Sequence, residues 1–220
     1  AIEPEYVEAY RNFGITLQEM NKLDESIQMY NQALELDPEN VATKFYLSLS
    51  LLSAGDYKRG LPLFDYRLVY DIDSVGTRFF PPPFWDGSNL EGQKILIWGE
   101  QGIGDEILYS TMYPDLIKMF PDCHIETESR LISLFNRSYK SEKNIIPFLS
   151  ITGTEKEYLN YDKIICAGSL GKFFRNNESS FPKNNKLIPN KEDLNLIKNK
   201  LKKFDNFKKI GISWKSKRQF

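Results

Sequence analysis

Residues 94–105 decide how the second half of the chain folds: Lys94-Ile95-Leu96-Ile97-Trp98-Gly99-Glu100-Gln101-Gly102-Ile103-Gly104-Asp105. The stretch begins with an apolar run of the length of a buried strand and continues into a turn that contains three glycines. An amphipathic stretch then runs from Glu106 to Phe120. The segment therefore predicts a strand, a glycine-rich turn and a helix, which is the opening of a βαβ unit.

The same alternation continues to the end of the chain. We expect strands at 124–127, 145–148, 163–167 and 210–214, and helices at 130–138 and 190–204. Strands that alternate with helices predict a parallel, doubly wound sheet, so residues 94–220 are expected to form a Rossmann-like α/β lobe.

Upstream of this lobe the sequence repeats itself at an offset of 34 residues. Residues from Val7 onward align with residues from Val41 onward, and the matched pairs are Phe13 with Leu47, Leu17 with Leu51, Leu23 with Tyr57 and Tyr30 with Phe64. The small residues Gly14 and Ala33 leave gaps that large residues of the paired helix fill. The second copy is weaker, because Ser48 replaces Gly14 and Arg67 takes the position of Ala33.

This pattern resembles the tetratricopeptide family over residues 7–70. The resemblance implies helical hairpins, and residues 1–5 are similar to the tail of a preceding repeat. Stacked repeats need about three units to bury a continuous core, so we expect two repeats to lean on the next domain or to be a remnant. We interpret their Tyr and Phe side chains as core rather than as the lining of a peptide groove.

A proline-rich segment, Phe79-Phe80-Pro81-Pro82-Pro83-Phe84-Trp85-Asp86-Gly87, ends the helical pattern. Three prolines cannot continue a helix, and the surrounding aromatic residues indicate a connector packed on a surface. We therefore expect repeats over 1–74, a connector over 75–93 and the lobe over 94–220.

Composition and charge exclude several classes of protein. Hydrophobic residues make up 41% of the chain and charged residues 27%, which excludes a disordered or fibrous chain. The net charge is −1, although residues 183–218 carry 12 Lys and Arg against 3 Asp and Glu. This basic stretch lacks interleaved aromatic residues at a stacking spacing, so we expect no nucleic-acid partner.

The sequence also carries no sign of a membrane span or of a metal site. No apolar stretch approaches the ~18 residues that cross a bilayer, and no signal-peptide pattern opens the chain. Cys123 and Cys166 are too isolated for a disulfide framework or a zinc site, and no carboxylate pair has ligand spacing. We expect a reduced, cytoplasmic protein with no metal and no cofactor, and we interpret the single histidine, His124, as a structural residue.

The glycine-rich turn matches neither Gly-x-Gly-x-x-Gly nor the Walker pattern, and three carboxylates at the helix start, Glu100, Asp105 and Glu106, would repel phosphate. Two roles remain open for Asp105. It is an N-terminal cap that accepts a bond from a free amide, or a general base at the carboxyl end of a strand, where open α/β sheets bind ligands.

Several motifs resemble those of a bacterial protein class in which tetratricopeptide repeats precede a glycosyltransferase-like domain. They are Trp85-Asp86-Gly87, Leu90-x-Gly92-x-x-Ile95-Leu96, Trp98-Gly99-Glu100-Gln101-Gly102-Ile103-Gly104-Asp105-Glu106, Gly168-Ser169-Leu170 with Phe173-Phe174-Arg175, and Ile210-Gly211-Ile212-Ser213-Trp214-Lys215-Ser216. The domain is similar to the heptosyltransferase family and, more distantly, to O-linked N-acetylglucosamine transferase. The resemblance implies the first half of a two-lobed GT-B fold.

The resemblance also implies roles for individual residues. Gly104-Asp105 matches the pair whose carboxylate deprotonates the acceptor hydroxyl in heptosyltransferases. Ser169 is expected to contact the acceptor, or else to be a turn hydroxyl. Trp214 and Lys215 either line the nucleotide cleft or are a core tryptophan beside a surface lysine. The remaining candidates for the acceptor pocket belong to the glycine turn: Gly99, Glu100, Gln101, Gly102 and Gly104.

Two hypotheses about function follow. In the first, the chain is the acceptor-side fragment of a glycosyltransferase that moves a sugar from a nucleotide sugar to a protein or glycan hydroxyl. The donor lobe is missing, so we expect the fragment to be inactive alone and to bind a nucleotide sugar only with that lobe. In the second, the chain is a non-catalytic protein-interaction scaffold in which Asp105 only caps a helix.

Overall fold

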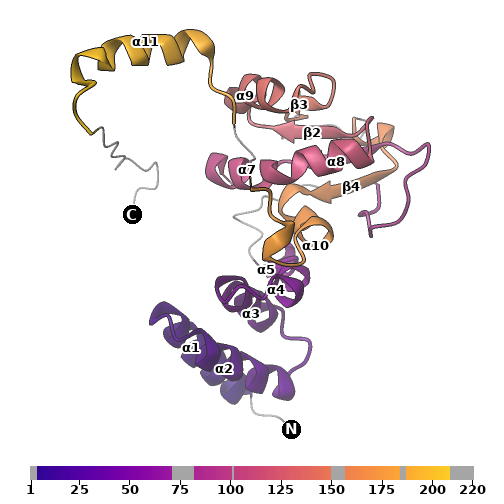
Figure 1. Cartoon of the computed structure of the whole chain (residues 1–220). Helices are drawn as coiled ribbons and strands as arrows, with labels where there is room; N and C mark the ends of the chain where they lie inside the picture. Colours follow the sequence, from indigo (N-terminus) through magenta and orange to yellow (C-terminus); the bar gives the residue numbers. More distant parts are fainter. Residues whose placement is uncertain (1–3, 71–81, 101, 150–156, 184–186, 209–220) are drawn as a thin grey trace.

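The computed structural model describes residues 4–70, 82–100, 102–149, 157–183 and 187–208 (Figure 1). Helical hairpins at the N-terminal end are followed by a four-stranded parallel sheet with helices, so the predicted α plus α/β fold class is confirmed. The strand expected at 210–214 and the connector up to residue 81 lie outside the described residues.

The first hairpin pairs α1 (Pro4–Glu19) with α2 (Leu23–Leu36). Tyr30 is fully buried, and a Cβ atom at Gly14 would lie 2.5 Å from its ring, so the predicted pairing of a large and a small residue is confirmed. Phe13 does not follow the expectation of core packing, because 54% of its surface is exposed. Helix α2 begins at Leu23, so Asp24 lies in its first turn.

The second hairpin departs from the first in its second helix. Helix α3 (Val41–Ser53) is long, but its partner is split into α4 (Tyr57–Phe64) and α5 (Arg67–Tyr70). Arg67 stands where the first repeat has Ala33, and its side chain turns away from the hairpin toward the sheet. The two hairpins are joined by hydrogen bonds from Ser26 to Ser50 (2.8 Å) and from Ser50 to Gln18 (2.9 Å).

The described part of the connector packs on the lobe, as the aromatic residues predicted. Ile164 donates its amide to the carbonyl of Pro83 (3.2 Å) and accepts from the amide of Trp85 (2.7 Å), so the connector lies along an edge of the sheet. The Trp85 side chain is buried against Phe120 and Phe173. Proline is tolerated there because an edge position needs fewer amide donors.

The sheet has the order β3-β2-β1-β4, and all its pairings are parallel. Its strands are β1 (Ile95–Trp98), β2 (His124–Thr127), β3 (Ile145–Pro147) and β4 (Lys163–Cys166). Each of the four falls within one residue of its predicted position. His124 begins β2, where its Nδ1 lies 2.7 Å from the hydroxyl of Tyr161.

The helix expected over 106–120 is divided. It consists of α7 (Ile103–Tyr109), the 3-10 turn η1 (Ser110–Met112) and α8 (Tyr113–Met119). Pro114 lies in the first turn of α8, where its missing amide costs nothing, but it could not continue α7. Helix α9 (Ser129–Tyr139) matches its prediction.

The sheet buries apolar side chains on both faces. Alternate residues such as Ile95, Ile97 and Ile125 pack with α8 and α9 in the larger core. The opposite face buries Leu96 and Ile164 under Tyr158, which belongs to the turn η2 (Tyr158–Asn160). Cys123 and Cys166, which the sequence places too far apart from other cysteines for a disulfide framework, are buried free thiols.

After β4 the chain forms η3 (Ala167–Leu170), α10 (Gly171–Phe174), η4 (Glu178–Ser180) and finally α11 (Lys191–Leu201) with η5 (Lys202–Phe204). Helix α11 confirms the predicted helix, but Leu196, Ile197 and Leu201 on it are exposed. Within the described ranges, no helix is long and apolar enough to cross a membrane.

The contact of Tyr30 with Gly14 can be tested by adding one methyl group. We expect Gly14→Ala to lower the free energy of unfolding by about 1–3 kcal/mol, because the new Cβ overlaps a fully buried ring. Gly104→Ala is the matched control, since it also adds a methyl to a helical glycine but meets no atom within 4 Å. Urea denaturation of both variants checks this, and equal stabilities would contradict it.

Candidate functional site

The candidate site lies at the carboxyl edge of the sheet, between β1 and β4. Strand β1 pairs with β2 on one side and with β4 on the other, so the chain reverses its direction of winding between β1 and β4. In open α/β sheets this switch point is where ligands bind. Glu100 follows β1 and Gly168 and Ser169 follow β4, so predicted site residues from two distant segments meet there.

Glu100 is buried, and both oxygens of its carboxylate accept hydrogen bonds. It accepts hydrogen bonds from the amide of Gly168 (2.8 Å) and from two nitrogens of Arg67, Nε (3.0 Å) and Nη2 (2.5 Å). The pairing is bidentate, which is the strongest geometry for an arginine and a carboxylate. The sequence analysis therefore identified Glu100 as a site residue. In the structure the partner of its carboxylate is Arg67, which belongs to the repeats.

Arg67 is fully buried although it belongs to the short helix α5. Its guanidinium also donates to the carbonyl of Phe64 (3.0 Å) and to the hydroxyl of Ser169 (3.1 Å). Burial alone would lower the pKa of Arg67, but the charge and hydrogen bonds of Glu100 outweigh it and hold this pKa above its ordinary value. The arginine stays charged within the switch-point crevice.

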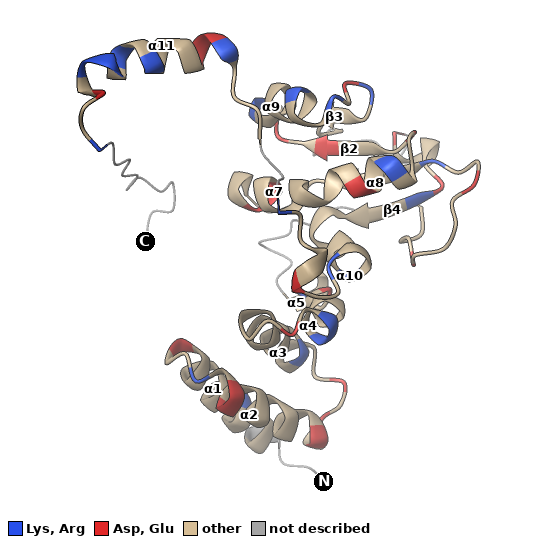
Figure 2. Cartoon of the chain, viewed as in Figure 1, with Lys and Arg blue, Asp and Glu red and all other residues tan. Residues whose placement is uncertain are grey.

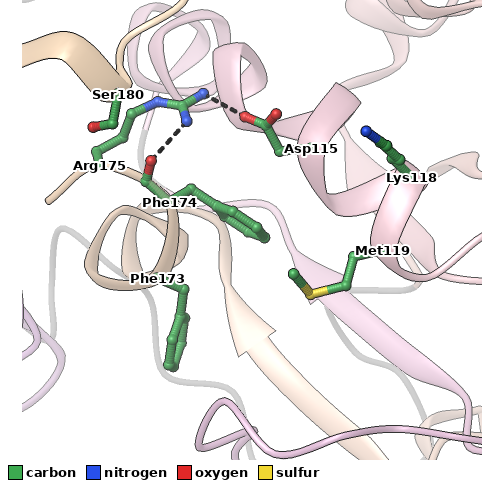
Figure 3. Close-up of a pocket in the computed structure, with 7 residues that line it drawn as sticks. All are labelled: Asp115, Lys118, Met119, Phe173, Phe174, Arg175 and Ser180. Atoms are coloured by element: carbon green, nitrogen blue, oxygen red, sulfur yellow. Dashed lines mark hydrogen bonds and ion pairs between the residues drawn. The ribbon is translucent and has the colours of Figure 1, made fainter.

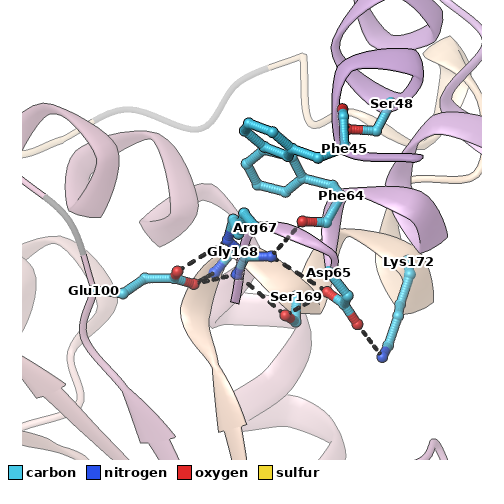
Figure 4. Close-up of polar contacts among 9 residues, drawn as sticks. All are labelled: Phe45, Ser48, Phe64, Asp65, Arg67, Glu100, Gly168, Ser169 and Lys172. Atoms are coloured by element: carbon cyan, nitrogen blue, oxygen red, sulfur yellow. Dashed lines mark hydrogen bonds and ion pairs between the residues drawn. The ribbon is translucent and has the colours of Figure 1, made fainter. Parts of the chain in front are cut away.

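A second ion pair extends this contact. Ser169 donates to Asp65 (2.6 Å), which in turn pairs with Lys172 of α10 (2.7 Å). Figure 4 shows the resulting chain of contacts between the repeats and the lobe. We refer to these five residues as the Arg67 cluster: Asp65, Arg67, Glu100, Ser169 and Lys172.

Apolar contacts surround the Arg67 cluster and come from one face of α4 and α5. Leu61 covers Gly171, where a Cβ atom would lie 2.7 Å from its side chain. Leu68 packs against Trp98 and Cys166. The expectation that the repeats lean on the next domain is confirmed, and the contact falls on the sheet edge that holds the candidate site.

The glycines of the site have different reasons to be glycine. A Cβ atom on Gly99 would lie 2.5 Å from Phe148, and one on Gly168 would lie 2.9 Å from Arg67. These two glycines are required by packing. A Cβ atom on Gly104 would meet nothing within 4 Å, so the turn is open on that side.

Asp105 lies at the start of α7 and is partly exposed. Its Oδ2 accepts a hydrogen bond from the amide of Gly102 (3.2 Å), which is three residues earlier. Asp105 is therefore not the N-cap of α7, as one of the two open roles predicted, because Gly102 holds that position; its carboxylate accepts the Gly102 amide from the third helical position. A role as base stays a prediction. Gln101, Trp214 and Lys215 lie outside the described residues.

Glu106 is a buried carboxylate to which sequence reasoning gave no separate role. It accepts hydrogen bonds from the hydroxyl of Thr127 (2.5 Å) and from the amide of Glu128 (3.0 Å), and so ties α7 to the end of β2. Burial raises the pKa of Glu106 above its ordinary value. The sequence contained one signal for the burial of Glu106. Glu106 follows Ile103 by three residues, and this spacing places both side chains on the inner face of one helix.

The part of the chain that the structure describes contains no group of three His, Cys, Asp or Glu side chains that could hold a metal ion.

Comparison with known proteins identifies the repeat and one long relative. The family described as "Tetratricopeptide repeat" matches residues 7–40. "Protein FlbA" of Caulobacter vibrioides is 26% identical over 230 residues, which covers 98% of this chain and 39% of the relative. The chain thus spans about two fifths of the length of that relative. No solved structure matches.

The first prediction from this site concerns stability. Arg67→Met leaves the Glu100 carboxylate buried without its partner, so we expect a loss of about 3–5 kcal/mol in the free energy of unfolding. The double variant Arg67→Met with Glu100→Met removes both charges and should recover most of the loss. Urea denaturation followed by circular dichroism measures both.

Arg59→Met is the control for this series, because Arg59 forms only an exposed ion pair with Asp56 on the same helix. Exposed pairs contribute at most about 1 kcal/mol. Equal free energies of unfolding for Arg67→Met and Arg59→Met would contradict the claim that the Arg67–Glu100 pair holds the repeats and the lobe together.

The second prediction concerns pH. A carboxyl whose pKa is raised by folding binds its proton more tightly in the folded state, so its contribution to stability is lost as the pH rises from 4.5 through the raised value. Glu106→Gln cannot titrate and can still accept the bonds of Thr127 and Glu128. We expect the stability of this variant, relative to the wild type, to increase between pH 4.5 and pH 8.

Thermal unfolding at several pH values tests this, with Glu91→Gln as the control because Glu91 is exposed on a loop. A difference between Glu106→Gln and the wild type that stays constant over this range would refute the assignment.

Proposed function

We propose that this chain is the acceptor-side part of a glycosyltransferase, in which the repeats hold a protein acceptor and the α/β lobe takes part in moving a sugar onto it. The coarser statement rests on the repeat itself: a tetratricopeptide repeat indicates a protein partner. The sugar-transfer step rests on the resemblance of the glycine turn and on the geometry described above.

The observation that supports the proposal most strongly is the place where the repeats dock. Arg67 reaches from α5 to Glu100 and Ser169, at the edge where α/β sheets bind their ligands. Repeats that only tethered a partner could attach anywhere on the lobe. Docking at this edge fixes whatever the repeats bind at a constant position relative to Asp105.

The outer surface of α1 supports a protein partner. Tyr6, Phe13 and Met20 are each more than half exposed, and their spacing of seven residues aligns them along one side of the helix. Residues 4–40 carry eight Asp and Glu against two Lys and Arg, as the red segments of the α1 and α2 ribbons in Figure 2 illustrate. This surface suits a partner that presents an apolar stripe with basic flanks.

Asp105 is the residue that we propose as the general base. Its carboxylate would take the proton of the acceptor hydroxyl as that oxygen attacks the anomeric carbon, while the bond from this carbon to the nucleotide phosphate breaks and the nucleoside diphosphate leaves. A positioned base contributes about 10²- to 10⁴-fold to such a rate. The open side of Gly104 leaves room for an acceptor next to this carboxylate.

The proposal requires a donor-binding lobe outside the described residues. Trp214 and Lys215 are proposed to line its nucleotide cleft, and the nucleotide sugar is a proposed ligand of that lobe alone. Ser169 is less suited to the acceptor than the sequence predicted, because its hydroxyl already bonds to Asp65 and Arg67.

A second candidate function is a protein-interaction scaffold without catalysis. Two observations favour it: the Asp105 carboxylate already accepts the amide of Gly102 at the start of α7, and the Arg67 side chain fills the crevice between β1 and β4. In a scaffold, both features serve only to keep the repeats and the lobe in a fixed arrangement.

Asp105→Asn separates the two functions, because the side-chain oxygen of asparagine can still accept the amide of Gly102 but asparagine cannot act as a base. We expect the variant, in the complete protein of its source organism, to keep its melting temperature and its partner. Sugar transfer to that partner should fall at least about 100-fold. The readout is the intact mass of the protein that co-purifies with the repeats.

Asp56→Asn is the control, since Asp56 also accepts a backbone amide at the start of a helix, as the N-cap of α4, and lies in the repeats. Its partner should carry the same sugar mass as in the wild type. A partner without any sugar in the wild type, or one still modified in Asp105→Asn, would favour the scaffold.

A further inference from the structure

A pocket of about 500 Å³ lies between α8 and the segment from α10 to η4. Small-molecule sites in proteins usually enclose roughly 300–1,000 Å³. Figure 3 shows the side chains that line it, from α8 on one side and from residues 173–180 on the other. The lining residues are Asp115, Lys118, Met119, Phe173, Phe174, Arg175 and Ser180.

One part of the pocket is apolar. Figure 3 places the Phe174 ring and the Met119 side chain on opposite sides of the space. Phe173 is held in place by Trp85, whose ring centroid lies 4.5 Å away. Met119 is 54% exposed, and a flexible thioether adapts to a ring of variable shape.

The other part of the pocket holds a buried cation. The Arg175 side chain pairs with Asp115 (2.9 Å) and donates to the carbonyls of Thr111 (2.7 Å) and Phe174 (2.8 Å). Its Nε is buried and has no hydrogen-bond partner within the described ranges. One carboxylate thus balances the charge of Arg175, and that carboxylate is itself half exposed.

Lys118 adds a second positive charge to the lining of the pocket. It is exposed on α8 and forms no ion pair with any residue that the structure describes. Two cations and one carboxylate leave the pocket with one net positive charge. An anion with a single charge would neutralise it, and Lys118 can approach such an anion as a flexible point charge.

We infer that this pocket binds a monoanion that carries an apolar group, with its carboxylate against Lys118 and its apolar group between Met119 and Phe174. A free aromatic or aliphatic acid has this chemistry, and so has a peptide that ends in an apolar residue. The inference does not depend on sugar transfer, because none of the residues involved belongs to the Arg67 cluster or to the glycine turn.

The test is a titration of the purified chain with 2-naphthoate, followed by nuclear magnetic resonance. The neutral isostere 2-naphthamide measures how much of the binding comes from the charge. We expect the amide signals of Lys118, Met119 and Arg175 to shift on binding. Naphthoate should bind about five- to tenfold more tightly than naphthamide, the size of a partly exposed charge contact.

Lys118→Glu should weaken naphthoate binding by about tenfold and leave naphthamide binding within twofold, because only the charge is reversed. Lys58→Glu is the matched control: it makes the same change on an exposed lysine of α4 and should alter neither ligand. Both variants lie on the surface, so their melting temperatures should equal that of the wild type.

A parallel titration with N-acetyl-Gly-Phe distinguishes the two sources of the anion. Tighter binding of the peptide than of naphthoate identifies a chain terminus, and tighter binding of naphthoate identifies a small acid. The inference is overturned if Lys118→Glu and Lys58→Glu bind naphthoate equally, or if the shifted signals lie outside this pocket.

Discussion

The structure depends on one buried ion pair, between Arg67 of the repeats and Glu100 of the lobe. Neither charge reaches water, so each is tolerable only because the other is present. Their two hydrogen bonds fix the distance and the angle between α5 and the end of β1. A pair of this kind contributes less to net stability than to the choice of one arrangement over others.

The position of this pair explains how the second hairpin buries its apolar face. Repeat arrays usually bury their core by stacking further repeats, and the second hairpin instead buries one face against the lobe through Leu61 and Leu68. The second helix of this hairpin is split into α4 and α5, because Arg67 cannot pack where Ala33 packs in the first repeat. The second hairpin therefore contributes Arg67 to the candidate site at the point where its second helix is split into α4 and α5.

Much of the fold could be predicted from the sequence because its signals are local. The short apolar runs predicted all four strands, and the pairing of Tyr30 with Gly14 follows from one repeat period. The division of the helix after β1 was missed because amphipathic spacing continues through Pro114. The exposed position of Phe13 was missed because periodicity locates a face of a helix without saying what covers it.

The site was predicted only in part. Glu100 and Ser169 were expected near a ligand, whereas both bond to Arg67, which is more than thirty residues from either of them in the sequence. The one signal for this contact in the sequence was Arg67, which takes the position of the small residue Ala33 in the second repeat. We interpreted it as a weak match to the repeat pattern and not as a contact with the lobe. Glu106 was hidden for a similar reason, because a buried carboxylate and an exposed one look alike in a run of acidic residues.

The central claim is that the repeats hold a partner next to the carboxyl edge of the sheet. Photo-crosslinking from two positions is the test: the exposed Phe13 on α1 and Gly104, where an added Cβ atom meets nothing within 4 Å. We expect both positions to capture the same partner protein in the source organism. A partner that crosslinks to position 13 and never to position 104 would contradict it, because the repeats would then hold that partner away from Asp105.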